Sequence, residues 1–212
     1  MHVCIQYGRI GSGKSGTAMA IAEEAINRYG SENVNPIISR DGDIVELIEC
    51  GMDDKLIQLL ICDDATLREV SDGDLKKFFK VRHLYKALTG KSNGYILTIF
   101  NVHRFHGLAI GLRTNIDTAI WRTPPTNPYD RSVVKRFVGE DGLQDLEYVE
   151  SLRIDNPEWN SVSVFTSRIW KGLLILPMAS QNHLREIDVK RSDIQIGFTL
   201  GDYLTRIGGM KR

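Results

Sequence analysis

The sequence has few cysteines and no long apolar run, and each shortage excludes a class of protein. Its 212 residues contain three cysteines, Cys4, Cys50 and Cys62, an odd number set among apolar neighbours. Such a set predicts buried free thiols in a reducing compartment, not a disulfide framework or a metal site. Apolar runs such as GLLILPM are far shorter than the roughly 20 residues of a membrane span. The stretch before the first glycine is too short for a secretory signal, so we expect no transmembrane segment and an intracellular site of action.

The chain also lacks net charge, because 27 basic residues balance 27 acidic ones, but the two signs are segregated. The segment from Asp41 to Asp74 contains eleven acidic residues and two basic ones. The segment from Leu75 to Ile116 contains no acidic residue. That second segment carries eight positive charges: Lys76, Lys77, Lys80, Arg82, Lys86, Lys91, Arg104 and Arg113. Two explanations stay open, a solvated helix face and a surface that binds a polyanion.

The clearest motif is GRIGSGKS, which spans Gly8 to Ser15 and matches the phosphate-binding loop G-x-x-x-x-G-K-S. Gly8 and Gly13 let the backbone turn tightly, so that successive N–H groups can surround a phosphate. The lysine reaches the β- and γ-phosphates and the serine hydroxyl ligates Mg²⁺, so the loop predicts ATP and Mg²⁺ as cofactors. The expected nucleotide contacts are Gly8, Arg9, Ile10, Gly11, Ser12, Gly13, Lys14, Ser15 and Gly16.

Strand and helix patterns alternate around this loop. HVCIQY leads into the loop as a strand, and apolar residues at helical spacing follow it as far as Gly30. Buried strands are expected at 35–40, 56–62, 94–101 and 116–122, with helices at 43–50, 71–88 and 106–113. This alternation predicts a three-layer α/β fold with a mostly parallel central sheet.

Beyond TPPTNP the pattern changes, without a long flexible linker. Helices are expected at 130–138 and 143–152, paired strands at 161–165 and 168–176, and one more helix in the last thirty residues. We therefore expect residues 1–212 to form a single P-loop domain with its motifs in 1–122. The segment 123–212 would complete the sheet and offer oligomer contacts.

Polar residues end two of the buried strands. LLICDDA places Asp63 and Asp64 directly after one strand, and YILTIFN ends in Asn101. An Asp at such a place holds Mg²⁺ together with the loop serine, so Ser15 and Asp63 are the expected metal ligands. Adjacent residues at a strand end point in different directions, which lets Asp64 face the attacking water. The Asn101 amide would donate to a γ-phosphate or orient the water.

The order of these motifs, followed by GLRTNI with Asn115, resembles the FtsK/HerA superfamily of DNA-translocating ATPases. The resemblance covers roughly Met1 to Arg122. In its small size the chain resembles the genome-packaging ATPases of membrane-containing icosahedral viruses, such as the turreted icosahedral viruses of Sulfolobus. It implies a RecA-like P-loop core that works as a homo-oligomeric ring, with ATP sites at subunit interfaces and double-stranded DNA as partner.

The resemblance also assigns roles to single residues. Lys14 and Ser15 are the Walker A pair, Asp63 the Walker B metal ligand, Asp64 the catalytic carboxylate and Asn101 the polar sensor. Asp64 departs from the glutamate that the family often has there and is one methylene shorter. A ring also needs an arginine finger from the neighbouring subunit, with Arg104 preferred among Arg40, Arg104, Arg113 and Arg122. The plausible DNA contacts are Lys76, Lys77, Lys80, Arg82 and Lys91.

The implied activity is ATP-driven packaging of a viral genome into a preformed capsid. Its expected site is the host cytoplasm and the virion vertex, with capsid or membrane-vertex proteins as further partners. Two other functions remain open at this point: a small nucleotide or metabolite kinase, and a nucleotide-dependent assembly switch. The three histidines of the basic segment, His83, His103 and His106, are read as phosphate contacts or ordinary surface residues.

Overall fold

The computed structural model of the chain describes residues 1–212 except 40–42, 66–70, 156–161, 168, 176–197 and 200–212. Its centre is an eight-stranded sheet with the strand order β7-β6-β5-β1-β4-β3-β2-β8. The five strands β5, β1, β4, β3 and β2 pair in parallel, and antiparallel strands extend the sheet at both ends. The strands are β1 (His2–Tyr7), β2 (Val34–Ser39), β3 (Ile57–Cys62), β4 (Tyr95–Val102), β5 (Thr118–Trp121), β6 (Val162–Ser167), β7 (Lys171–Ile175) and β8 (Phe198–Thr199).

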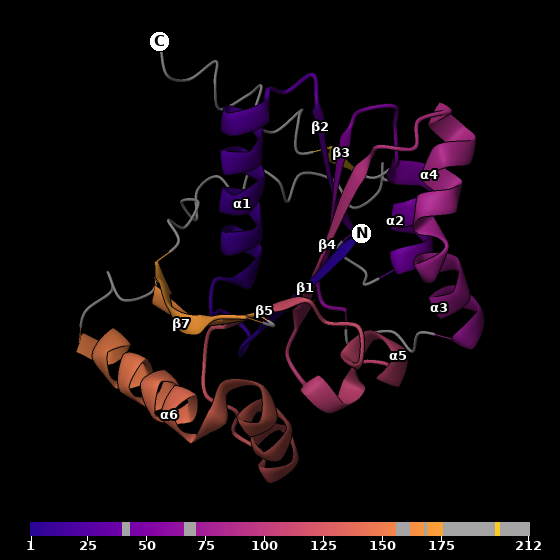
Figure 1. Cartoon of the computed structure of the whole chain (residues 1–212). Coiled ribbons are helices and arrows are strands. Elements are labelled where there is room, and N and C mark those ends of the chain that lie inside the picture. Colours follow the sequence, from indigo (N-terminus) through magenta and orange to yellow (C-terminus); the bar gives the residue numbers. More distant parts are fainter. Residues whose placement is uncertain (40–42, 66–70, 156–161, 168, 176–197, 200–212) are drawn as a thin grey trace.

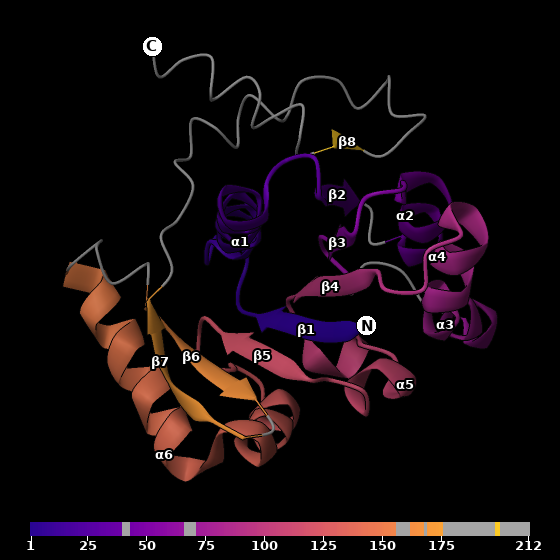
Figure 2. The same ribbon diagram turned by 45° about the horizontal axis from the view of Figure 1, so that its top comes forward.

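Helices cover both faces of this sheet, which confirms the three-layer α/β prediction (Figures 1 and 2). Of the described helices, α1 (Lys14–Tyr29) packs on one face, where Ala18, Met19 and Ala22 meet the strands. All the others cover the opposite face: α2 (Ile44–Gly51), α3 (Asp72–Phe79), α4 (Val81–Thr89), the 3₁₀ turn η1 (Phe105–Gly107), α5 (Ile110–Arg113) and α6 (Pro128–Asp155). None of the described helices has both the length and the apolar composition that crossing a bilayer would require.

The strand β3 shows why the central strands are apolar throughout. Leu59 and Ile61 pack toward α1, whereas Leu60 and Cys62 pack toward the opposite layer, and all four are at most 1% exposed. Because both faces of a parallel sheet are buried, such a strand needs apolar residues at every position. Cys4 and Cys62 are buried free thiols, as expected.

Two helical segments differ in detail from the predictions. The single helix expected at 71–88 is two helices, α3 and α4, because Lys80 leaves the helical region at φ −91 and ψ 2. Ser71 starts α3 with a capping box, in which its side chain and that of Asp74 each accept from the other's backbone N–H. The two helices expected at 130–138 and 143–152 are the halves of α6, which bends at Gly139, where φ is 78 and ψ is −178. Only glycine adopts that conformation readily, so the kink position follows from the sequence.

The described strands of the later part of the chain belong to the same sheet. The strands β6 and β7 form an antiparallel hairpin that adds to β5, and α6 packs beneath it (Figure 2). β8 adds to the other edge, antiparallel to β2. The helix expected in the last thirty residues falls outside the described residues, and the single-domain boundary 1–212 remains a prediction.

Candidate functional site

The strand order changes direction at β1, and this places a site at the carboxyl ends of the strands. β1 and β4 are neighbours, but the chain leaves β1 toward β2 on one side and leaves β4 toward β5 on the other, so these two connections diverge. Ligands of open α/β sheets bind at such a switch point. The loop after β1, the two aspartates after β3 and the residues that end β4 therefore meet at one edge.

The phosphate loop has the backbone that its glycines predict. Gly13, which immediately precedes α1, has φ 82, a left-handed conformation that strongly favours glycine. A Cβ on Gly8 would lie 2.5 Å from Ser12 Oγ and 2.9 Å from Arg122 Cβ, so no larger residue fits there without movement. The loop leads directly into the N-terminus of α1, whose first N–H groups and dipole favour an anion.

The Lys14 side chain is folded back onto its own loop. Its Nζ donates to Gly8 O at 2.8 Å and Arg9 O at 3.0 Å, and it lies 2.9 Å from His103 Nδ1. Burial lowers the pKa of Lys14 to about 8; the nearby Asp63 and Asp64 oppose this shift and Arg122 adds to it. A buried ammonium held only by neutral acceptors is well suited to exchange one of them for a phosphate oxygen.

Asp63 forms the centre of a second cluster. Ser15 Oγ donates to Asp63 Oδ2 at 2.8 Å, and Asn101 Nδ2 donates to Asp63 Oδ1 at 2.7 Å. The structure thus brings the predicted metal ligand Asp63 into direct contact with both Ser15 and the predicted sensor Asn101. Asn101 is fully buried, and its Oδ1 has no hydrogen-bond partner. An unpartnered buried acceptor calls for a donor such as a water hydrogen.

These residues fit Mg²⁺ held jointly by protein and nucleotide. A hydroxyl and a carboxylate at hydrogen-bond distance offer the oxygen ligands that Mg²⁺ prefers. Among the described residues there is no group of three or more His, Cys, Asp or Glu side chains that could hold a metal. The ion would therefore depend on phosphate and water for its remaining ligands, as Mg²⁺ commonly does.

Asp64 has a different hydrogen-bond partner from the adjacent Asp63. It is the only described residue other than glycine with a positive φ, at 49, so the chain turns sharply after β3. Its Oδ1 is in a short contact with His103 Nε2, while the Asp64 side chain remains 38% exposed. Asp64 can therefore contact both the partly buried His103 and solvent.

The arginine-finger candidates separate by burial. Arg122 is fully buried, with 0% of its surface exposed. Its guanidinium donates to Ser12 O at 2.8 Å, Thr17 Oγ1 at 2.9 Å and Ser163 Oγ at 3.1 Å. Burial, and to a lesser extent Arg153, lowers its pKa to about 10. Including Arg122 among the candidates was wrong, because a side chain buried beneath its own phosphate loop cannot reach another subunit.

The other three candidates have different positions. Arg104 is exposed, just beyond β4, and its place beside the site is compatible with the predicted role. Arg113 donates from α5 to Tyr129 Oη at 3.1 Å. Arg40 lies outside the described residues.

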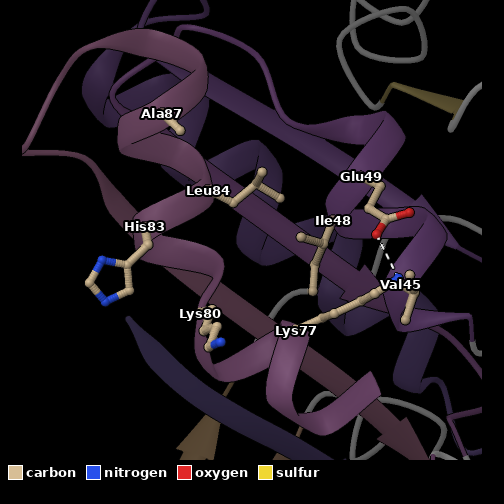
Figure 3. Close-up of a pocket in the computed structure, with 8 residues that line it drawn as sticks. All are labelled: Val45, Ile48, Glu49, Lys77, Lys80, His83, Leu84 and Ala87. Carbon is tan, nitrogen blue, oxygen red and sulfur yellow. Dashed lines mark hydrogen bonds and ion pairs between the residues drawn. The ribbon is translucent and has the colours of Figure 1, made fainter. Parts of the chain in front are cut away.

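The predicted DNA contacts do not form one continuous cluster. Lys76, Lys80 and Arg82 are exposed on α3 and α4 and at the break between them. Lys77 lies 2.9 Å from Glu49 of α2, across a groove of about 350 Å³ that also borders Lys80 and His83 (Figure 3). Lys91 lies near the amino ends of the strands, where its Nζ is 3.9 Å from Asp54 Oδ2. The DNA-contact assignment remains a prediction.

Sequence reasoning missed two residues of the site. His103 was treated as a phosphate contact or surface residue, although it touches both Lys14 and Asp64. Arg122 was included among four arginine-finger candidates, although its hydrogen bonds connect the phosphate loop to α1 and β6. Its place at the end of the apolar run TAIW was the available signal, since a charge there is either at the surface or held by hydrogen bonds.

Known proteins with this fold include viral packaging NTPases. The crystal structure of B204, the DNA-packaging ATPase from Sulfolobus turreted icosahedral virus, matches with a TM-score of 0.51 and 11% identity, over 84% of this chain and 98% of that one. The genome packaging NTPase B204 from Sulfolobus turreted icosahedral virus 2 in complex with ATPγS matches with a TM-score of 0.54 and 11% identity, over 84% and 97%. Its complex with AMPPCP matches with a TM-score of 0.53 and 8% identity, over 84% and 98%. No protein-family model and no curated protein sequence matches the chain. This chain therefore has the P-loop fold of those packaging NTPases, as its motifs predicted.

Proposed function

We propose that this protein is an ATPase that moves double-stranded DNA and packages a viral genome into a preformed capsid. The observation that carries the proposal is the cluster at the carboxyl ends of β1, β3 and β4. There Ser15 and Asn101 both donate to Asp63, and Asp64 faces outward beside the phosphate loop. The fold shared with packaging NTPases supports the use of that site for packaging.

Within this site the residues have separate tasks. Lys14 exchanges one of its three acceptors for a phosphate oxygen, and the N–H groups of the loop surround the neighbouring phosphate. Ser15 and Asp63 would hold Mg²⁺, and the bound ion would supply positive charge to neutralise the phosphates. Asn101 fixes the Asp63 carboxylate through its amide N–H, while its free Oδ1 accepts a hydrogen bond from water.

Asp64 is the general base of the proposed hydrolysis. Its carboxylate accepts a proton from the attacking water, which then adds to the γ-phosphorus as the bond to the β-phosphate oxygen breaks. A partly exposed aspartate next to the loop has room for that water. Asp64 is one methylene shorter than a glutamate, so it depends more on being held in place.

The proposal extends to assembly. In a homo-oligomeric ring Arg104 would approach the ATP site of the neighbouring subunit, and the basic residues Lys76, Lys80 and Arg82 would contact DNA phosphates. The ring would act in the host cytoplasm and at the virion vertex, docked on capsid or membrane-vertex proteins.

Steady-state ATP hydrolysis by the full chain, with and without linear duplex DNA at two salt concentrations, tests the proposal. We expect DNA to stimulate hydrolysis and the stimulation to fade as salt rises, because phosphate contacts are lost to counterions. The variant Lys14→Ala controls for contaminating ATPases. Hydrolysis that ignores DNA would contradict translocation, and stimulation by a small phosphate acceptor instead would identify a kinase. Nucleotide binding without turnover would indicate a switch.

A further inference from the structure

His103 joins the two functional halves of the site. It follows the last residues of β4, where Nδ1 lies 2.9 Å from Lys14 Nζ and Nε2 contacts Asp64 Oδ1. Its side chain is 19% exposed, so the ring is largely enclosed between the loop and the aspartate. No other described side chain has hydrogen-bonding contacts to both Lys14 and Asp64.

The contacts of Lys14 determine which nitrogen of His103 carries the proton. An ammonium has three N–H donors, and three acceptors surround this one: Gly8 O, Arg9 O and His103 Nδ1. Nδ1 must then accept, which leaves the proton on Nε2, facing the Asp64 carboxylate. The alternative, an Nδ1–H that donates to Gly8 O at 3.1 Å, would set two donors against each other 2.9 Å apart.

We propose that His103 is a positioning residue that couples nucleotide binding at Lys14 to the orientation of Asp64. The inference rests on the proposed function, since it takes Asp64 as the general base. Through Nε2–H the ring holds one oxygen of Asp64 and leaves the other for water. Through Nδ1 it competes with the phosphates for Lys14, so Lys14 must leave the ring when nucleotide binds.

Two substitutions separate these contacts. The side-chain amide of Gln can place an N–H near the position of Nε2, whereas that of Asn can place an acceptor near Nδ1 but does not extend to Asp64. His103→Gln thus keeps the contact to Asp64, His103→Asn keeps the contact to Lys14, and His103→Ala keeps neither. His83→Ala, at an exposed position on α4, is the matched control.

The experiment measures kcat and KM for ATP, together with the affinity for a fluorescent non-hydrolysable ATP analogue. His103→Ala and His103→Asn should lower kcat by about tenfold or more without raising KM, because Asp64 is no longer held. His103→Gln should keep kcat within about threefold of the unmodified protein. Loss of the competing acceptor in the Ala and Gln variants should tighten analogue binding by up to about tenfold, and the Asn variant should bind like the unmodified protein.

Three results would overturn the inference: an unchanged kcat in His103→Ala, an equal fall in kcat for Gln and Asn, or a rise in KM parallel to the fall in kcat. The last result would mean that the ring only supports the loop. Absence of hydrolysis in the unmodified protein would instead refute the proposed function, and the order of analogue affinities would still decide whether His103 competes for Lys14.

Discussion

Replacing Asp130 by Asn tests how the residues beyond β4 are anchored. Asp130 lies in the first turn of α6 and is 0% exposed. Its Oδ2 accepts from Asn127 Nδ2 at 2.8 Å and from Tyr7 Oη at 3.4 Å, and its Oδ1 accepts from the backbone N–H of His106 at 3.1 Å. One carboxylate therefore fastens α6 to β1 and to η1, two residues beyond Arg104.

The amide of an asparagine cannot satisfy this environment. Whichever oxygen of Asp130 becomes NH₂, it faces an N–H donor, either that of His106 or that of Asn127. The Asn127 side chain cannot simply reverse, because its Oδ1 already accepts from Asp130 N at 2.7 Å. One charge-assisted hydrogen bond is lost and one buried donor is left unpaired, so we expect a loss of about 2–4 kcal/mol in the free energy of unfolding. For a chain of this length that corresponds to a fall in Tm of roughly 5–15 °C.

The loss should depend on pH in a defined direction. Burial raises the pKa of Asp130, but hydrogen bonds from Asn127 and His106 outweigh it, and the net shift is downward. A carboxyl whose folded pKa is depressed contributes its full stability above the unfolded value of about 3.9, and loses it as pH falls through the folded value. The difference between the two proteins should thus be greatest near neutral pH and shrink below about pH 4.

Urea unfolding followed by tryptophan fluorescence, from pH 7 down to pH 3, measures this difference. Asp145→Asn, at an exposed position on the same helix, is the control and should change stability by less than about 0.5 kcal/mol. A difference that stays constant as pH falls, or an Asp130→Asn variant as stable as the control, would refute the account of the buried carboxylate.

Three further predictions concern the site. Asp64→Asn should retain nucleotide binding and lower kcat by about a hundredfold or more, as measured by analogue binding and steady-state hydrolysis; preserved turnover would remove Asp64 as the base. Gly8→Ala should weaken nucleotide binding by about tenfold or more, because its Cβ would collide with Ser12 Oγ; titration with the fluorescent analogue would measure this. The double variant Lys76→Ala, Lys80→Ala should make the slope of log DNA affinity against log salt concentration shallower by about two, as measured by fluorescence anisotropy. An unchanged slope would exclude these two lysines as DNA contacts.

Much of the fold could be predicted because the signals are local. The run IQLLIC needs two covered faces, which only a strand in the middle of an α/β sheet has, and the glycine loop needs a strand before it and a helix after it. The break at Lys80 could not be predicted in this way, since the sequence there has no glycine or proline. The buried Phe78 and Val81 also keep a helical spacing across the break.

In the candidate site, too, some residues could be predicted from local sequence signals and others could not. Asp63 and Asn101 were predictable, because parallel strands bring their carboxyl ends to one edge whatever their order. The place of His103 depends instead on the order and register of the strands. β1 pairs directly with β4, with Gln6 opposite Asn101 and Tyr7 opposite Val102, so the next position along β4 lies beside the start of the phosphate loop. Lys14 and His103 are 89 positions apart in the sequence, and only this pairing brings them together. A polar residue two places after a strand-end asparagine therefore belongs to the nucleotide site only when its strand adjoins the loop-bearing strand. For that reason the order of the strands, rather than a longer motif, decides whether such a residue can sense the nucleotide.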